Sequence, residues 1–152
     1  MRFKYFEKIA IFITVAIFFI SADRFLKVFA FNIRDHKFNL IGEILKFKYK
    51  ENYYIAFSLP LTGNILIILV ILTITALILF CLYRFNKREY SELTGLVLII
   101  LGASSNLYDR IKYSFVIDYL DLKYFTVFNL SDLMIVAGVF LLLIKNKLFK
   151  NQ

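Results

Sequence analysis

The chain has 152 residues, of which 61% are hydrophobic and 18% are aromatic, and its formal net charge is +8. This length suffices for one domain, residues 1–152, and the apolar content exceeds the roughly 45–50% of soluble domains, which excludes an ordinary soluble protein. The Lys and Arg residues flank apolar runs and form no single basic face, so we expect contact with membrane lipid and no binding of nucleic acid.

Four segments are apolar over a length that approaches or reaches the roughly 20 residues of a membrane-spanning helix. They are residues 9–29, 64–83, 93–108 and 130–149. We therefore predict a membrane all-α fold, a bundle of four transmembrane helices. The similar numbers of cations on the two sides do not orient it, but their density in the short flanks at the termini and at 84–92 favours cytoplasmic positions for both termini.

The first segment permits a second interpretation. It follows three cations and passes through Ser21 and Ala22, which is also the pattern of a cleaved secretory signal peptide. Against cleavage, Ile20 is too large for the small-residue pattern, and the apolar character resumes as far as Phe31. We interpret the segment as an anchor that stays in the protein.

The loop at about 32–63 is long enough to hold structure of its own. Residues 46–50 alternate lysine with Phe47 and Tyr49, and this period of two is typical of a half-buried strand. We expect a small β-sheet at the membrane surface, with aromatic side chains toward lipid or substrate and lysines toward phosphates. A solvated hairpin without a binding role is the alternative.

Polar side chains gather at the end of the third segment. Within residues 102–110, Gly102, Asn106 and either Asp109 or Arg110 share one helical face. The small residues at 102–105 allow another helix to approach closely. The polar face is therefore expected to lie against a neighbouring helix.

Two aspartates flank the connection from the third segment to the fourth. Residues 113–119 are rich in β-branched and aromatic types, which predicts an extended stretch that brings Asp118 back over the mouth of the bundle. The fourth segment opens with Asn129 or Ser131 as a natural helix cap and Asp132 in the first turn. Taken singly, Asp132 is a capping acid and Asp118 is a loop acid.

A chemical role arises if the connection folds these two carboxyls face to face. Two adjacent carboxylates cannot both ionise, so one proton is shared and one pKa rises. An acid and a base then coexist in one site, and together they can activate water for attack on a peptide carbonyl with no metal and no covalent intermediate. The titration belongs to the pair.

The small numbers of cysteine and histidine residues exclude other protease chemistries. The chain has one cysteine, Cys81, and one histidine, His36, so a thiolate cluster and a His-x-x-x-His metal site are both impossible. A serine–histidine pair would require His36 to reach a serine such as Ser104 inside an apolar segment. We expect His36 to be a surface residue and the site to use no metal and no cofactor.

The polar blocks occur in an order that resembles the lipoprotein signal peptidase family, also called signal peptidase II, across almost the whole chain. The blocks are Asp23…Lys27, residues 52–57 from Asn52 to Phe57, Gly102…Asn106…Asp109-Arg110, Val116-Ile117-Asp118 and Phe128-Asn129-x-Ser131-Asp132. The resemblance implies a four-helix aspartyl endopeptidase of the bacterial inner membrane, with both termini cytoplasmic, its active site near the outer leaflet and an outer loop that forms a cradle on the membrane. It further implies cleavage of prolipoproteins before the diacylglyceryl-modified cysteine and inhibition by globomycin.

The resemblance also assigns roles by matching motif. It makes Asp118 and Asp132 the catalytic pair, and it assigns structural support to Asp23, Lys27 and Asp109. Site-shaping and substrate-binding roles fall to Asn52, Asn106, Arg110 and Asn129. The chain departs from the family pattern at Tyr54, where glycine is usual, at Ser105, where glycine or a similar residue is usual, and at Ser131, where alanine is usual.

A non-enzymatic membrane protein is the alternative, either a scaffold or a transporter subunit whose acids relay protons. A proton relay places an acid near the middle of the membrane, whereas every acid in or beside a span here lies at a span end. We therefore expect the peptidase, and since a cleft open to lipid needs only one chain, we expect a monomer.

Overall fold

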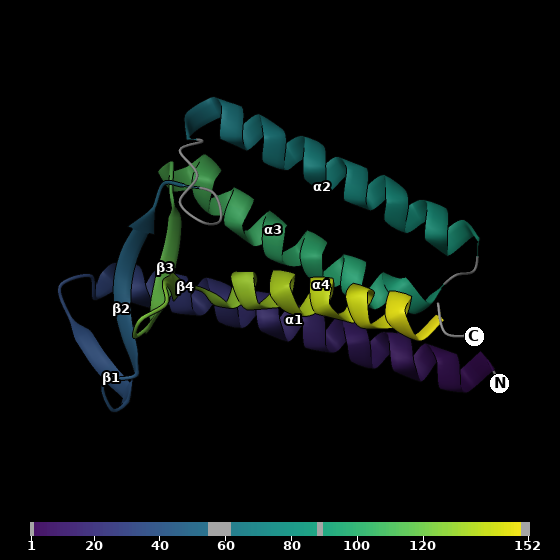
Figure 1. The fold of residues 1–152 in the computed structure, drawn as a ribbon, viewed down its shortest axis with the longest axis horizontal. Coiled ribbons are helices and arrows are strands. Elements are labelled where there is room, and N and C mark those ends of the chain that lie inside the picture. The colour runs from purple at the N-terminus through teal and green to yellow at the C-terminus, as the bar shows by residue number, and fades with distance from the viewer. Residues whose placement is uncertain (1, 55–61, 88–89, 150–152) are drawn as a thin grey trace.

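The computed structural model describes residues 2–54, 62–87 and 90–149 (Figure 1). In these residues the helices are α1 (Arg2–Asn32), α2 (Gly63–Asn86), α3 (Leu93–Tyr113) and α4 (Leu130–Phe149), with a short 3-10 helix, η2 (Tyr90–Glu92), before α3. The strands are β1 (Lys37–Ile41), β2 (Leu45–Asn52), β3 (Val116–Leu122) and β4 (Val127–Phe128).

Each predicted apolar segment lies within one helix. The largest difference in length is at α1, which begins at Arg2, before the predicted start at 9. Helix α3 continues past the predicted end at 108 to Tyr113 and stops where Ser114 adopts a left-handed conformation, with φ 69°. In the described residues only α2 is both long and apolar enough to cross a membrane, and α4 contributes a shorter apolar stretch, Leu130–Ile144. The four predicted helices are thus confirmed, whereas this criterion of length and composition identifies one of them as a membrane span.

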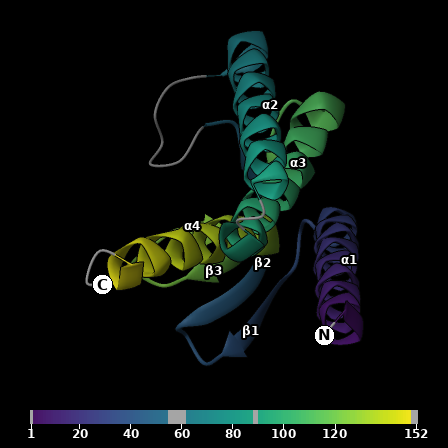
Figure 2. The ribbon, with the colours of Figure 1, turned by 90° about the vertical axis from the view of Figure 1, so that its right-hand side faces the viewer.

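The helices surround α3, which contacts each of the other three (Figure 2). Glycines permit the closest of these contacts, between α3 and α4. A Cβ atom placed on Gly95 would lie 2.8 Å from the carbonyl oxygen of Gly138, and one on Gly102 would lie 2.5 Å from that of Ser131. The close approach predicted for residues 102–105 is therefore confirmed, and it holds the start of α4 against the polar face of α3.

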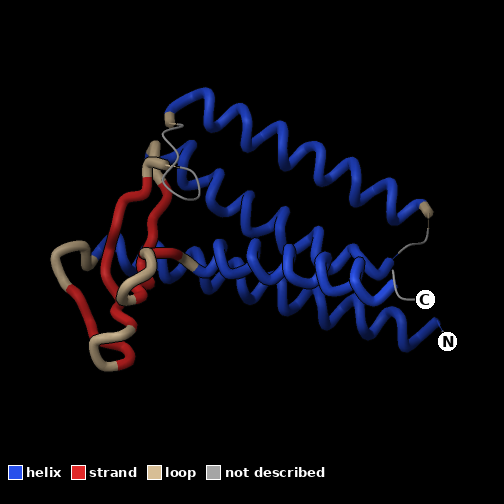
Figure 3. The backbone as a smooth tube through the Cα atoms, in the orientation of Figure 1, coloured by secondary structure: helices blue, strands red, loops and turns tan. Residues whose placement is uncertain are grey.

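The strands form one antiparallel sheet with the order β1-β2-β3-β4. The sheet crosses one end of the helical bundle, and both termini lie at the opposite end (Figure 3). The predicted strand at 46–50 falls within β2, which pairs with β1 and with β3, so the predicted small sheet is confirmed and the segment is more than a hairpin. The far boundary predicted for this loop, Pro60, lies outside the described residues.

The orientation predicted for the aromatic side chains of β2, toward lipid or substrate, is wrong. Phe47 is buried, with its ring centroid 5.4 Å from that of Tyr119 and 5.6 Å from that of Phe29. This face of the sheet closes over the end of α1, so its aromatic side chains fill a protein core and not a lipid or substrate surface. Two of the three lysines pair with carboxylates, Lys46 with Glu43 and Lys48 with Asp121, and both remain partly exposed.

This small core fixes the position of β3. Ala30, Phe47, Ile117 and Tyr119 form a buried cluster that joins α1, β2 and β3. Because successive side chains of a strand point to opposite faces, Ile117 and Tyr119 share the face of this cluster and Asp118 points the other way. The sheet thereby directs Asp118 away from this cluster and toward Asn129 at the start of α4.

Candidate active site

Asp118 is a buried carboxyl that is held by two amides. It is 1% exposed, its Oδ1 accepts a hydrogen bond from Nδ2 of Asn129 (2.7 Å), and its Oδ2 accepts one from Nδ2 of Asn52 (2.9 Å). Burial is the main cause that raises the pKa of Asp118 to about 7, and the charge of Asp132 adds to it. The amide bonds act in the opposite direction but are outweighed.

Asp132 lies in the first turn of α4 and is also held by N–H donors. Its Oδ1 accepts from Nδ2 of Asn106 (2.8 Å), and its Oδ2 accepts from the backbone N–H of Asn129 (3.2 Å). In return the side-chain oxygen of Asn129 accepts from the backbone N–H of Asp132 (2.9 Å). This reciprocal arrangement is a capping box, so Asn129 is the cap of α4 and Ser131 is not.

The side chain of Asn129 joins the two acids. Its Nδ2 donates to the carboxyl of Asp118, while its Oδ1 binds the backbone of Asp132, and it is completely buried. The extended stretch predicted to return Asp118 to the start of the fourth helix is present as β3, which pairs antiparallel with β4 just before Asn129. The structure thus brings Asp118 and Asp132 into one site.

Arg110 borders this site one helical turn beyond Asn106. Its Nη2 donates to the carbonyl oxygen of Tyr54 (3.2 Å), and its Nη1 lies 3.4 Å from the carbonyl oxygen of Asn106. Its Nε is buried and has no hydrogen-bond partner in the described part of the chain. The N–H of Arg110 Nε could therefore donate a hydrogen bond to a bound molecule beside the two acids.

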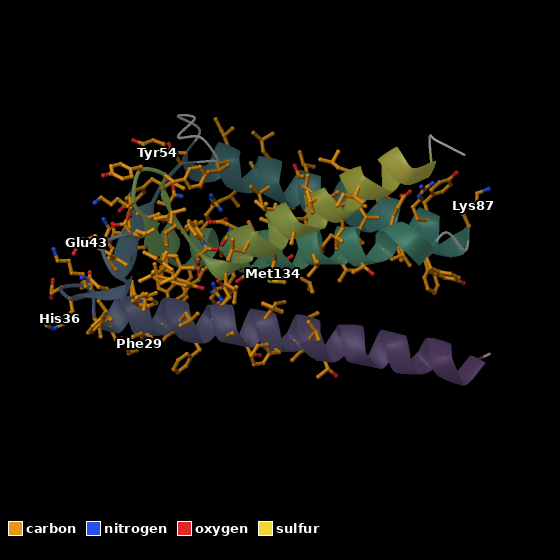
Figure 4. The ribbon with its side chains drawn as sticks, turned by 60° about the horizontal axis from the view of Figure 1, so that its bottom comes forward. Phe29, His36, Glu43, Tyr54, Lys87 and Met134 are labelled. Atoms are coloured by element: carbon orange, nitrogen blue, oxygen red, sulfur yellow. The ribbon has the colours of Figure 1, made fainter. Side chains whose placement is uncertain are left out.

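Asn52 and Tyr54 bring the end of β2 to the site. The side-chain oxygen of Asn52 accepts from the backbone N–H of Tyr54 (3.1 Å), while its amide group holds Asp118. The contacts of Tyr54 with Asn52 and Arg110 use its backbone, and Tyr54 is 46% exposed, at the same end of the bundle as the sheet (Figure 4). The rest of the block, up to Phe57, lies outside the described residues.

A second polar cluster lies between α1 and α3 and adjoins the first at Asn106. The predicted Asp23–Lys27 ion pair is present at 3.2 Å, and Nζ of Lys27 also lies 2.8 Å from Asp109 and 2.7 Å from Oδ1 of Asn106. Arg24 adds a second cation, 2.7 Å from Asp109 and 3.3 Å from Asp23. The negative charges of two carboxylates are thus balanced by the positive charges of two cations in a largely buried environment.

Three hydroxyl groups complete the surroundings of Asp23. The hydroxyls of Ser105 and Ser131 each donate to Oδ2 of Asp23 at 2.7 Å, and the hydroxyl of Tyr119 lies 3.2 Å from Oδ1. The sequence did not predict these contacts or the role of Arg24. In the sequence Ser131 is a candidate helix cap and Ser105 is one of the small residues at 102–105, and neither signal indicates a contact with Asp23.

His36 lies far from both clusters. It is exposed in the turn before β1, at the outer edge of the sheet (Figure 4). This placement agrees with the prediction of a surface residue, so His36 is not a partner for a serine nucleophile.

Comparison with known proteins identifies the family. A family model described as signal peptidase (SPase) II matches residues 15–148. The chain belongs to the signal peptidase II family. The lipoprotein signal peptidase of Clostridium novyi is 30% identical over 139 residues, which cover 87% of this chain and 94% of that protein. That of Clostridioides difficile is 32% identical over 149 residues, which cover 93% and 98%.

Solved structures show the same fold. One, described as a bacterial membrane enzyme, superposes with a TM-score of 0.79 at 24% identity and covers 94% of this chain and 90% of its own. A second of the same description has a TM-score of 0.74 at 23% identity. As a member of the signal peptidase II family, the chain is a membrane-embedded aspartic peptidase that removes signal peptides, which excludes the non-enzymatic alternative.

Proposed function

We propose that Asp118 and Asp132 are the catalytic pair of a prolipoprotein signal peptidase, which cleaves before the diacylglyceryl-modified cysteine. The supporting observation is that one buried asparagine, Asn129, holds both acids, and that the hydrogen-bond donors to these acids within residues 2–54, 62–87 and 90–149 are amides. The relatives are named lipoprotein signal peptidases, and this activity is carried from them to the chain.

The proposed reaction needs one proton between the two carboxyls. Asp118, whose pKa is raised to about 7, carries it, and Asp132, beside the positive end of α4, acts as the base. Asp132 takes a proton from water as the hydroxyl attacks the peptide carbonyl, and Asp118 donates its proton to the carbonyl oxygen. The tetrahedral intermediate collapses as Asp132 protonates the leaving nitrogen and a hydroxyl of the intermediate returns a proton to Asp118.

The surrounding residues divide into two roles in this proposal. Asn52, Asn106 and Asn129 orient the carboxyls, because each donates to one of them. Arg110 contacts the substrate, because a peptide carbonyl would satisfy the N–H of its Nε. Asp23, Lys27 and Asp109 support α1 against α3.

We also propose how the chain lies in the membrane. All four helices cross the bacterial cytoplasmic membrane as one monomeric domain, residues 1–152, with both termini in the cytoplasm and the acids near the outer leaflet. The arrangement is supported by the position of the sheet at the end of the bundle opposite the termini (Figure 1), since Asp118 belongs to strand β3 of that sheet, and by the many exposed apolar side chains of the helices. Globomycin would bind at the same acids.

The test is cleavage of a diacylglyceryl prolipoprotein by the full chain in detergent. We expect Asp118→Asn and Asp132→Asn each to abolish cleavage, and globomycin to inhibit the unaltered protein. Full cleavage by either variant would refute the assignment of the catalytic pair. Cleavage of an unlipidated precursor at the same rate would refute the substrate class alone.

A further inference from the structure

Each catalytic acid has a chain neighbour that binds the same distant carboxylate, Asp23. Tyr119 follows Asp118, and its hydroxyl donates to Oδ1 of Asp23 (3.2 Å). Ser131 precedes Asp132 and donates to Asp23 twice, from its hydroxyl to Oδ2 (2.7 Å) and from its backbone N–H to Oδ1 (3.2 Å). A single carboxylate on α1 therefore holds both the strand that carries one acid and the helix that carries the other.

The first N–H groups of α4 are bound by three different elements. An isolated helix leaves these groups without a partner. Here the N–H of Leu130 donates to the hydroxyl of Tyr119 (3.0 Å), that of Ser131 to Asp23, and that of Asp132 to the Asn129 cap. The rotation of the first turn, and with it the direction of Asp132, is thus set by β3 and α1 as well as by the cap.

The ring of Tyr119 is rigid enough to act as a spacer. It is completely buried and packs against Phe47 in the core cluster, so its hydroxyl has a fixed position relative to the backbone of Asp118. That hydroxyl donates to Asp23 and accepts from Leu130, and so uses both its capacities. Burial and the nearby charge of Asp23 raise the pKa of Tyr119, which keeps the hydroxyl protonated as a donor.

We infer that Tyr119 and Ser131 are positioning residues, which act through Asp23 to hold Asp118 and Asp132 at the separation that the reaction requires. This inference rests on the proposed catalytic pair. An error of about 1 Å in such a site costs on the order of 100-fold in rate, so loss of either hydroxyl should slow catalysis without changing the residues that meet substrate. Asp23 would keep its two cations in both variants.

The test compares Tyr119→Phe and Ser131→Ala with a matched control, Ser105→Ala. Ser105 donates to the same oxygen of Asp23 at the same distance as the Ser131 hydroxyl, but it lies beside neither catalytic acid and does not bind the start of α4. We expect the two test variants to lower kcat about 10- to 100-fold with KM changed less than about threefold. We expect the control to keep kcat within about threefold.

Two further readouts separate positioning from general support. The pH dependence of kcat should shift in both test variants and not in Ser105→Ala, because only the test variants alter the relation of the two acids. The midpoint of thermal unfolding should fall by similar amounts in all three, since each loses a buried hydroxyl bond. Rates are expressed per folded protein, so a loss that follows the folded fraction or appears equally in all three variants overturns the inference.

The outcomes also separate this inference from the proposed function. If Asp118→Asn and Asp132→Asn are inactive but Tyr119→Phe and Ser131→Ala retain full kcat and the original pH profile, the catalytic pair stands and the positioning role fails. If either aspartate variant remains active, the proposed function itself fails.

Discussion

The protein contains two pairs of buried acids whose partners differ in charge. Asp23 and Asp109 lie against Lys27 and Arg24, which balance their charge. Asp118 and Asp132 lie against asparagine amides and a backbone N–H, which provide hydrogen bonds but no full positive charge. Burial is similar at Asp109 and Asp118, so the two pairs differ in the charge of their hydrogen-bonding partners and not in their exposure to water.

Asn106 separates the two clusters. Its oxygen accepts from Nζ of Lys27 (2.7 Å), and its amide donates to Asp132 (2.8 Å). A neutral side chain therefore lies between a buried cation and Asp132, one of the two acids proposed to be catalytic. We interpret Asn106 as a spacer that passes on orientation while keeping a direct ion pair away from Asp132.

The largest effect should come from changing an acid of the pair that is held by neutral amides. Asp118→Asn keeps the shape of the side chain but removes the shared proton, so we expect kcat to fall about 10⁴-fold or more. The unfolding midpoint should stay nearly the same, because Asp118 carries the shared proton in the proposed pair and asparagine keeps the shape of that neutral side chain. Both are measured on purified protein in detergent, and a large fall in stability would show that this carboxyl is structural.

The same chemical change in the other cluster should act on stability. Asp109→Asn leaves Lys27 and Arg24 with one carboxylate between them, and breaking a buried charge pair in this way typically costs about 3–5 kcal/mol. We expect a lower free energy of unfolding in chemical denaturation, with kcat per folded molecule reduced far less than in Asp118→Asn. Unchanged stability would contradict the charge-balanced interpretation of this cluster.

Replacing Asn106 should have an intermediate effect on both stability and kcat. In Asn106→Leu, Lys27 keeps its two carboxylates, while Asp132 loses a donor and keeps the N–H of Asn129. We expect stability to fall by about 1–3 kcal/mol for the unmet hydrogen bonds and kcat to fall about 10- to 100-fold. Ser104→Ala, on the same helix, is the control. Equal kcat in both variants would exclude an orienting role for Asn106.

Much of the site could be predicted because its signals are local. The alternation at 46–50 identified β2, and the β-rich run at 113–119 identified the extended stretch before the last helix. The capping pattern at 129–132 placed Asp132 in a first turn, although it left Asn129 and Ser131 as alternatives for the cap. Each of these inferences uses spacing within a few residues, where backbone geometry is nearly fixed.

The contacts that were missed depend on several elements at once. The hydroxyls that meet Asp23 come from α3, β3 and α4, and no spacing within one element indicates that they converge. The period-two pattern shows that Phe47 and Tyr49 share a face, but it does not show that α1 covers that face. Arg24 was missed for the same reason, because its partner Asp109 lies on another helix.

The smallest expected effect is a shift in the pH at which Asp118 and Asp132 lose their shared proton. The pKa of Asp118 is about 7, so kcat should decline as the pH rises through that region and the shared proton is lost. Asn52 donates to the ionised carboxyl and thereby lowers its pKa. Asn52→Ala should therefore raise the pKa of Asp118 further, so that the decline begins at a higher pH.

A moderate loss of kcat, about 3- to 10-fold, should accompany this shift, because Asn129 still holds the other oxygen of Asp118. The measurement is the alkaline side of the kcat profile for Asn52→Ala beside that for Asn39→Ala, whose side chain binds Glu43 at the far end of the sheet. The control should keep the original profile. A shift to lower pH in Asn52→Ala would mean that this amide stabilises the protonated acid, and an equal shift in both variants would mean that the sheet as a whole sets the pKa.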